Sequence, residues 1–490
     1  MGALASLLQD LGWTVTGSDH PLYPPMSNFL ESRKIPVKAF DAKNLEGGTW
    51  QLKKKNPDMV IVGNAISRTH AEALATEALL ARTGAESQVG TPIVRMSFAQ
   101  ALAEFCIGTK RSFVVAGTHG KTTTTSVLAW ALESLGQNPG FFVGGIPKNF
   151  GQGCRVGDGK VFVSEGDEYD TAYWDKESKF LHYRSSWVLC TSIEFDHADI
   201  YASLEAVEAS FLKLVDRTRE GWILIDGPSS PSPESVDKIA LKLASKGLPC
   251  HRYGREASSR YRLLSCDSAI LPWDSSLRGT RVCVSTPELG KIELYSPLIG
   301  EHNALNLVGV IGTLLASKSA TKAEELQDFL KTFQGVKRRQ DEVFVSSALV
   351  VIDDFAHHPT AIRETLGAIR AKYPGSAVGA FFEPRSATSA RNVLAKGFSE
   401  CFDGADAVFL VPPTKTNVPE AERLDVVDVL RKAKARPGNA DKLYVTDTSV
   451  ENLAARFKAW RASQQGRRAV ALVMSNGPFG GLHGMLAKDC

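Results

Sequence analysis

The sequence predicts an α/β protein of three domains, and three observations lead to that prediction. The chain has 490 residues, more than one hydrophobic core usually serves and about three domains at ~150 residues each. Hydrophobic residues make up 43% of it and charged residues 23%, so each domain can bury a core. Short β-type runs alternate with helical patterns, which is typical of parallel sheets. We expect domains at 1–108, 109–334 and 335–490.

Composition excludes several classes of protein. The net charge is only +3, and no basic block suggests a nucleic-acid partner. No apolar run approaches the ~18 residues that cross a bilayer. The 8 cysteines are scattered without a Cys-x-x-Cys pair, which favours a reducing compartment over a disulfide framework or a zinc site. We therefore expect a cytoplasmic protein that binds neither nucleic acid nor membrane.

The N-terminal region, 1–108, has the pattern of a Rossmann-like domain. Leucines repeat on one face of a helix expected over 3–11, and Gly12 ends it. Strands are expected over 13–19 and 57–64. Such a domain opens with a strand and a Gly-rich turn before its first helix, whereas this sequence opens inside that helix. Either the start codon is misplaced or the domain lacks its first strand.

Polar residues at the ends of these two strands are candidate ligand-binding groups. Asp19 ends the first strand, and an acidic residue there holds a ribose hydroxyl in dinucleotide-binding folds. Asn64 and Arg68 belong to the loop after the second strand, where a ligand lies in an open α/β sheet. An ordinary strand-to-helix connection explains that loop equally well.

A phosphate-binding loop is predicted by the sequence VVAGTHGKTTTT, in which an apolar strand runs into a glycine-framed turn and then a helix. Gly117 and Gly120 let the backbone approach phosphate, Lys121 can reach the β- and γ-phosphates, and the Thr122 hydroxyl can bind Mg²⁺. Val115 replaces the first glycine of the full motif. The strand before the loop and the helix after it nevertheless favour a P-loop ATPase-like central domain.

Two later strands of the central domain run into acidic clusters. Glu165 opens the first cluster, and the second contains Asp196, His197 and Asp199. In a phosphate-loop fold such strand ends lie beside the loop, where a carboxylate or an imidazole can hold Mg²⁺ against ATP. A solvated turn is the usual explanation for one acidic cluster, but two clusters near a phosphate loop favour metal binding.

The sequence GEHNALNL opens a long apolar helix further along the central domain. Asn303 and Asn306 are three residues apart, so they share a face of its first turn. Helix capping accounts for one asparagine but not for both. Contact with the edge of an adenine is the sharper interpretation.

The C-terminal region begins with a plausible hinge near Gly335 and continues with alternating strands and helices. This pattern predicts a second Rossmann-like domain. Its last strand ends in SNGPFGGLH, which is either a simple turn or backbone that approaches a ligand. The expected strands cover 349–354, 377–382, 407–411 and 469–474.

Taken in order, these motifs resemble those of the ATP-dependent Mur ligases, and the resemblance covers nearly the whole chain. Within that family, the stretches at 168–172 and 382–386 most resemble the member that joins UDP-N-acetylmuramate to the murein tripeptide L-alanyl-γ-D-glutamyl-meso-diaminopimelate. The member that adds L-alanine is the alternative. The matching motifs are GTHGKTT at 117–123, Glu165, Asp196-His197, His302-Asn303, Arg338-Arg339 and DFAHHP at 354–359.

The resemblance implies that ATP, with Mg²⁺, converts the muramic acid carboxylate into an acyl phosphate, which the amine of the peptide then attacks. It places ATP on Gly117, Thr118, His119, Gly120, Lys121, Thr122, Thr123, His302, Asn303 and Asp354. It assigns catalysis to Lys121, His197 and Arg339, and Mg²⁺ to Thr122, Glu165 and His197. The remaining candidates are Asp19, Asn64 and Arg68 for the uridine nucleotide and Arg385 for a peptide carboxylate.

Two other classes fit parts of the pattern. A phosphate-loop switch or ATPase would bind nucleotide without joining anything, and an opening without a strand also allows a nonfunctional remnant. The separate third domain favours a second substrate, and hence a ligase.

Overall fold

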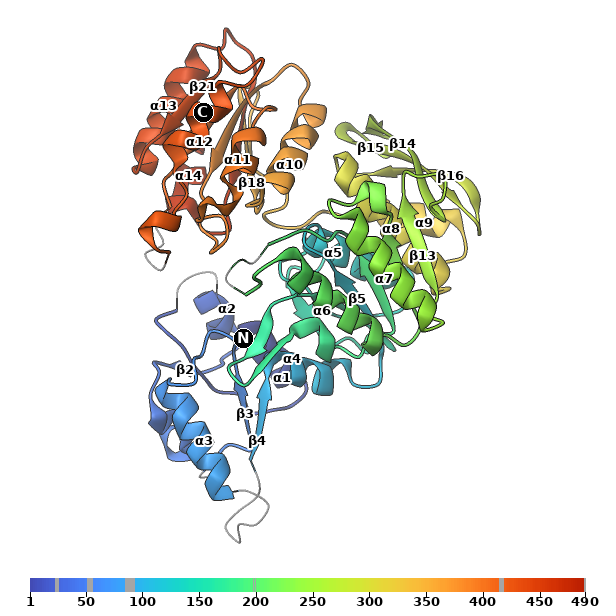
Figure 1. The fold of residues 1–490 in the computed structure, drawn as a ribbon, viewed down its shortest axis with the longest axis vertical. Helices are drawn as coiled ribbons and strands as arrows, with labels where there is room; N and C mark the ends of the chain where they lie inside the picture. Colours follow the sequence, from blue (N-terminus) through green and yellow to red (C-terminus); the bar gives the residue numbers. More distant parts are fainter. Residues whose placement is uncertain are drawn as a thin grey trace.

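The structure is a computed structural model that describes residues 1–22, 26–50, 56–83, 93–196, 198, 200–413 and 418–488. Two large sheets and a smaller N-terminal part account for its shape (Figure 1). We call the elements before β5 the N-terminal unit, those from β5 to α9 the central unit, and those from β17 to α14 the C-terminal unit. A multi-domain α/β architecture is therefore present, as the sequence predicts.

The central unit is built on a ten-stranded sheet in the order β16-β15-β14-β13-β12-β11-β5-β8-β6-β7. The strands from β6 to β14 along this order pair in parallel, whereas β15, β16 and the edge strand β7 pair antiparallel. The strands are β5 (Arg111–Ala116), β6 (Gly140–Phe142), β7 (Cys154–Arg155), β8 (Val161–Gly166), β11 (Trp187–Cys190), β12 (Gly221–Ile225), β13 (Cys250–Gly254), β14 (Tyr261–Leu271), β15 (Asp274–Thr286) and β16 (Gly290–Ser296).

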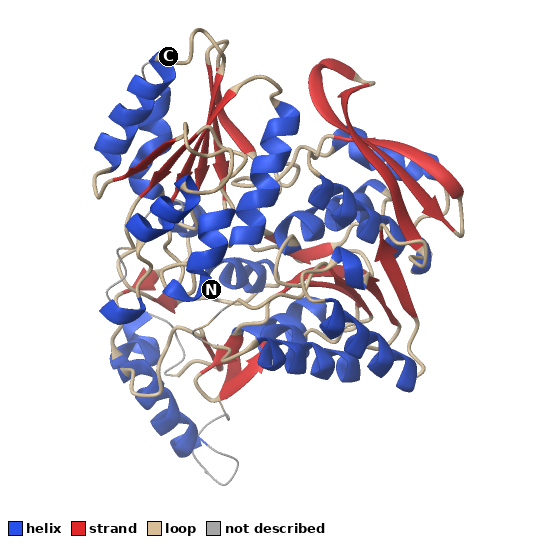
Figure 2. Ribbon diagram, turned by 45° about the horizontal axis from the view of Figure 1, so that its top comes forward, coloured by secondary structure: helices blue, strands red, loops and turns tan. Residues whose placement is uncertain are grey.

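Helices cover both faces of this sheet (Figure 2). Among them, α8 contacts α5, α5 contacts α9, and α6 contacts α7. Every residue of β8, β11 and β12 is buried, as expected for parallel strands packed on both faces. The helices are α5 (Lys121–Ser134), α6 (Leu204–Arg217), α7 (Pro233–Ser245), α8 (Glu301–Ala316) and α9 (Ala323–Thr332).

The C-terminal unit contains a six-stranded sheet in the order β17-β18-β22-β19-β20-β21, with β17 antiparallel and the others parallel. Separate hydrophobic clusters lie on its two faces. All four strands expected in this region are present. The elements are β17 (Asp341–Val345), β18 (Leu349–Asp354), α10 (Pro359–Lys372), β19 (Ala377–Phe382), α11 (Ala395–Glu400), β20 (Ala407–Leu410), α12 (Val426–Lys434), β21 (Leu443–Thr446), α13 (Val450–Ala462), β22 (Ala469–Met474) and α14 (Leu482–Ala487).

The N-terminal unit has two separate two-stranded parallel sheets, β1-β2 and β3-β4. The expected helix is confirmed as α1 (Gly2–Asp10), and its buried leucines belong to the core of the central unit. The strand expected over 13–19 is wrong in length, because only β1 (Gly17–Ser18) pairs with a neighbour. The other elements are α2 (Met26–Ser32), β2 (Val37–Lys38), β3 (Met59–Val62), α3 (Ala71–Thr83), β4 (Val94–Ser97) and α4 (Phe98–Ala101).

Two expectations drawn from composition can be compared with these residues. None of the described helices is long and apolar enough to cross a membrane. The seven cysteines that the structure describes are free thiols, so no disulfide framework joins them.

Candidate active site

The phosphate loop connects β5 to α5, as the sequence predicts. β5 ends at Ala116 and α5 begins at Lys121. Gly117 has a φ of +137°, and a Cβ built on it would lie 2.3 Å from Thr191 Oγ1. Only glycine, which has no Cβ, can adopt this backbone conformation with a neighbouring atom so close. The loop is therefore held tightly against the segment that follows β11.

Lys121, the candidate phosphate-binding cation, is buried and already paired. Its Nζ donates to the carbonyl of Gly117 at 2.7 Å and lies 2.8 Å from Oε2 of Glu168. Burial by itself lowers the pKa of this lysine, but the negative charges of Glu168, Asp167 and Glu165 together outweigh it and raise the pKa above its ordinary value. The sequence placed Glu168 in the acidic cluster after β8 but did not connect it with Lys121.

Thr122, Glu165 and Arg339 meet beside the loop, although they come from three distant parts of the sequence. The Thr122 hydroxyl donates to Glu165 Oε1 at 2.9 Å, and Arg339 Nη2 donates to the same hydroxyl at 2.8 Å. The backbone N–H of Gly144 donates to Glu165 Oε2 at 2.7 Å. Burial, followed by the charge of Asp167, raises the pKa of Glu165. These hydroxyl and carboxylate oxygens are the donors that Mg²⁺ prefers.

A cavity of about 660 Å³ adjoins the loop and reaches the C-terminal unit. Its volume lies in the range of small-molecule sites. Asp354 lines it and accepts the N–H groups of Gln340 and Ala356, each at 2.8 Å. Burial raises the pKa of this carboxyl. The predicted residues that line the cavity are His119, Gly120, Thr123, His302, Asn303, Arg339 and Asp354, together with Asn306.

Asn303 and Asn306 lie on the first turn of α8, with different neighbours. Asn303 Nδ2 donates to the carbonyl of Ile299 at 2.8 Å. A Cβ on Gly120 would lie 2.9 Å from Asn306 Nδ2. Asn306 therefore lies against the phosphate loop, whereas Asn303 bonds the chain just before α8, and adenine contact stays a prediction.

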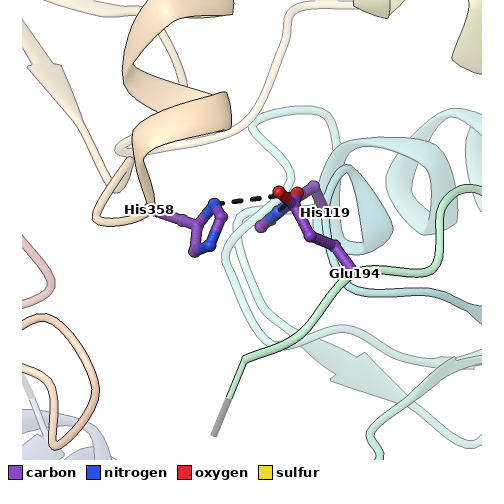
Figure 3. Close-up of side chains that lie close together, drawn as sticks. All are labelled: His119, Glu194 and His358. Carbon is purple, nitrogen blue, oxygen red and sulfur yellow. Dashed lines mark hydrogen bonds and ion pairs between the residues drawn. The ribbon is translucent and has the colours of Figure 1, made fainter. Parts of the chain in front are cut away.

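One carboxylate joins the phosphate loop to the C-terminal unit (Figure 3). Glu194 Oε2 lies 2.8 Å from His119 Nε2 and 3.7 Å from His358 Nδ1. Burial raises the pKa of Glu194, but the hydrogen bond and charge of His119 outweigh this and hold the pKa below its ordinary value. The sequence places Glu194 in the acidic stretch that follows β11, where the motifs assign it no role.

The predicted metal ligand His197 lies outside the residues that the structure describes, and so does Asp199. Their neighbour Asp196 is described and buried, and its Oδ2 lies 4.0 Å from His357 Nε2. A role for His197 in metal binding therefore stays a prediction.

The predicted substrate residues occupy two further places. Asp19 and Asn64 line a cavity of about 1170 Å³ in the N-terminal unit, whereas Arg68 is exposed outside that lining. Arg385 lies over the loop after β22, because a Cβ on Gly477 would be 2.5 Å from its Nη1. The structure thus separates Arg68 from the two other N-terminal candidates and places Arg385 beside the glycine-rich loop.

Two family models match this chain. The Mur ligase middle domain matches residues 115–314, and the Mur ligase, glutamate ligase domain matches residues 338–477. A relative in Escherichia coli strain K12, UDP-N-acetylmuramate–L-alanyl-γ-D-glutamyl-meso-2,6-diaminoheptandioate ligase, is 35% identical over 99% of this chain and 94% of its own. UDP-N-acetylmuramate–L-alanine ligase of Pediococcus pentosaceus is 31% identical over 84% of this chain and 81% of its own.

A solved structure agrees with these matches. The murein peptide ligase of Psychrobacter arcticus 273-4 is 28% identical, covers 99% of this chain and 95% of its own, and superposes with a TM-score of 0.64. The family models, the relative that spans almost the whole chain and the loop geometry all agree. The chain belongs to the Mur ligase family, whose members are ATP-dependent ligases that form C–N bonds.

Proposed function

We propose that this chain uses ATP to join UDP-N-acetylmuramate to L-alanyl-γ-D-glutamyl-meso-diaminopimelate. The observation that carries this proposal is the likeness to the Escherichia coli ligase of that substrate pair, which spans 99% of this chain and 94% of that enzyme. The relative that acts on L-alanine is aligned over only 84% of the chain. The tripeptide is therefore the better-supported acceptor.

The proposed reaction has two steps on one carboxylate. A carboxylate resists attack by an amine because its oxygen is a poor leaving group, so phosphorylation by ATP converts it into an acyl phosphate. The α-amine of the tripeptide then attacks the carbonyl carbon, and the intermediate collapses to an amide and inorganic phosphate. Lys121 and Arg339 supply positive charge where the phosphoryl oxygens become more negative.

Thr122 and Glu165 are the residues we propose as the holders of Mg²⁺. Their oxygens lie 2.9 Å apart in a buried position, and a hard cation would satisfy a carboxylate that burial leaves poorly solvated. Bound there, Mg²⁺ would neutralise phosphate charge. We also propose His197 as a ligand of a second Mg²⁺, on the motif alone.

We further propose a division of labour along the chain. Residues 1–108 bind the uridine nucleotide through Asp19, Asn64 and Arg68. Residues 109–334 bind ATP, and residues 335–490 bind the tripeptide with Arg385 on one of its carboxylates. A guanidinium suits that task because it can donate two parallel hydrogen bonds.

Measurement of ADP release with each substrate omitted in turn tests the proposal. We expect release only when ATP, UDP-N-acetylmuramate and the tripeptide are all present. Equal turnover with L-alanine in place of the tripeptide would contradict the tripeptide assignment. ADP release from ATP alone would instead identify a switch or an ATPase.

A further inference from the structure

The segment 191–196 follows β11 and is hydrogen-bonded to the phosphate loop. The N–H of Thr118 donates to the Ser192 carbonyl at 3.0 Å, and the N–H of His119 donates to Ser192 Oγ at 2.9 Å. The N–H of Glu194 donates to Thr118 Oγ1 at 2.9 Å. A displacement of this segment would therefore move the loop with it.

The same segment contacts the C-terminal unit further along. Asp196 Oδ2 lies 4.0 Å from His357 Nε2. The N–H of Ala198 donates to Thr388 Oγ1 at 3.1 Å. Segment 191–196, together with Ala198, therefore forms a bridge between the central and C-terminal units.

The Glu194 carboxylate contacts both sides of this bridge with separate oxygens. Figure 3 shows its contacts with His119 and His358. Oε2 lies 2.8 Å from His119 Nε2 on the phosphate loop. Oε1 accepts a hydrogen bond from Thr360 Oγ1, in the first turn of α10, at 2.9 Å. Hydrogen bonds to an ionised carboxylate are stronger than those between neutral groups.

Two imidazoles and a carboxylate could also bind zinc, and the distances decide between the two arrangements. Zinc bonds of about 2.0–2.2 Å in a tetrahedral site place neighbouring ligand atoms roughly 3.3–3.6 Å apart. The separation of 2.8 Å between His119 and Glu194 is instead that of a direct hydrogen bond. The cluster is therefore best described as a hydrogen-bonded contact between two units.

We propose that Glu194 is a positioning residue that latches the C-terminal unit onto the phosphate loop, through His119 on one side and Thr360 on the other. The inference rests on the proposed function in one respect, that the C-terminal unit carries the amine. The latch then fixes the distance between that amine and the acyl phosphate made at the loop. The latch therefore controls how closely the C-terminal unit approaches the phosphate loop, and it does not control the binding of ATP.

Substitution of Thr360 gives a matched pair of variants, because valine keeps the shape of threonine and serine keeps its hydroxyl. We expect Thr360→Val to lower kcat about tenfold, as loss of a hydrogen bond to a charged group does, with an unchanged calorimetric Kd for ATP. Thr360→Ser should retain near wild-type kcat. Small-angle scattering of the full chain with ATP analogue and Mg²⁺ should give a larger radius of gyration for Thr360→Val than for Thr360→Ser.

Glu194→Ala and the double variant Glu194→Ala/Thr360→Val complete a double-mutant cycle with Thr360→Val. We expect the double variant to match Glu194→Ala, since both changes break one latch. If the kcat losses of the two single variants multiply in the double variant, the proposal is overturned. It is also overturned if Thr360→Val has the same kcat and the same radius of gyration as wild type. If a chelator instead increases the radius of gyration of the wild-type chain in the absence of Mg²⁺, and added zinc reverses the increase, the cluster is a metal site and not a latch. Scattering requires no turnover, so it tests the latch even if the proposed substrates are wrong.

Discussion

The phosphate loop and the N-terminal cavity are both candidate ligand sites, but they differ in burial. Lys121, Thr122 and Glu165 are buried and hydrogen-bonded. Asp19 and Asn64 are exposed at the edge of a wide cavity. Side chains fixed before the ligand arrives can stabilise a transition state, whereas exposed side chains must be ordered during binding. We therefore expect changes at the loop to alter turnover and changes at the cavity to alter affinity.

The largest expected effect is at the loop. Lys121→Ala should reduce ADP release by about three orders of magnitude or more, because it removes positive charge at a phosphoryl centre. Lys246→Ala, at the exposed end of α7, is the control and should retain wild-type release. A Lys121→Ala enzyme with more than a tenth of wild-type activity would contradict the role given to this lysine.

Alanine substitution at two glycines with positive φ, one in each region, compares how tightly the two regions are packed. At Gly117 a Cβ would meet Thr191 Oγ1 at 2.3 Å, whereas at Gly12, with φ +89°, no heavy atom lies within 4 Å. Gly12→Ala should cost about 1 kcal/mol of unfolding free energy from backbone strain alone, and Gly117→Ala about 3 kcal/mol or more. Urea denaturation measures both. Equal losses would mean that the loop can relax away from its neighbours.

A buried histidine at the latch should make stability depend on pH. Burial, aided by the nearby His119, lowers the pKa of His358 to about 4. Between its ordinary pKa of 6.5 and pH 4, the unfolded chain gains a proton that the folded chain does not. Stability should therefore fall as the pH falls, by about 2.5 kcal/mol between pH 7 and pH 4.5.

Chemical denaturation of His358→Asn against wild type measures this contribution. Asparagine keeps the N-cap of α10 but cannot titrate, so the difference between the two proteins should shrink or reverse as the pH falls. His20→Asn, in the exposed part of the N-terminal unit, is the control. A pH-independent difference for His358→Asn would show that the imidazole has the same pKa in the folded and unfolded chains.

The smallest effect should be at the N-terminal cavity. Asn64→Ala removes an exposed amide and should raise the KM for UDP-N-acetylmuramate about threefold to tenfold, with kcat unchanged. Arg68→Ala, outside the cavity lining, should have a weaker effect than Asn64→Ala. Initial rates over a range of substrate concentrations separate the two constants. A fall in kcat for Asn64→Ala would remove the distinction between the two sites.

The sequence predicted best where a local pattern determines the structure. The strand, glycine turn and helix around Lys121 are present as expected, because the loop motif restricts backbone and side chains together. The strand ending at Asp19 was overestimated, because β-type residues form a strand only where a neighbour accepts their hydrogen bonds.

Long-range pairs were beyond the sequence alone. The bond from Arg339 to Thr122 joins residues 217 positions apart, and the bond from Thr360 to Glu194 joins residues 166 positions apart. Motifs named Arg339 and Thr122, but only the packing of units identifies their contact. Glu168 and Glu194 stand in acidic stretches that resemble family motifs, but nothing in the sequence pairs them with Lys121 or Thr360.

The ion pair between Lys121 and Glu168 has a consequence for which ligands the loop accepts. Any ligand that recruits this lysine must compete with a carboxylate already in contact with it. A neutral molecule, or one with a single dispersed charge, would stabilise the lysine charge less than Glu168 does. A polyphosphate would stabilise it more, since several negative oxygens converge on the same turn. Because Glu168 competes for Lys121, the loop should bind only molecules whose negative charge attracts the lysine more strongly than this carboxylate does.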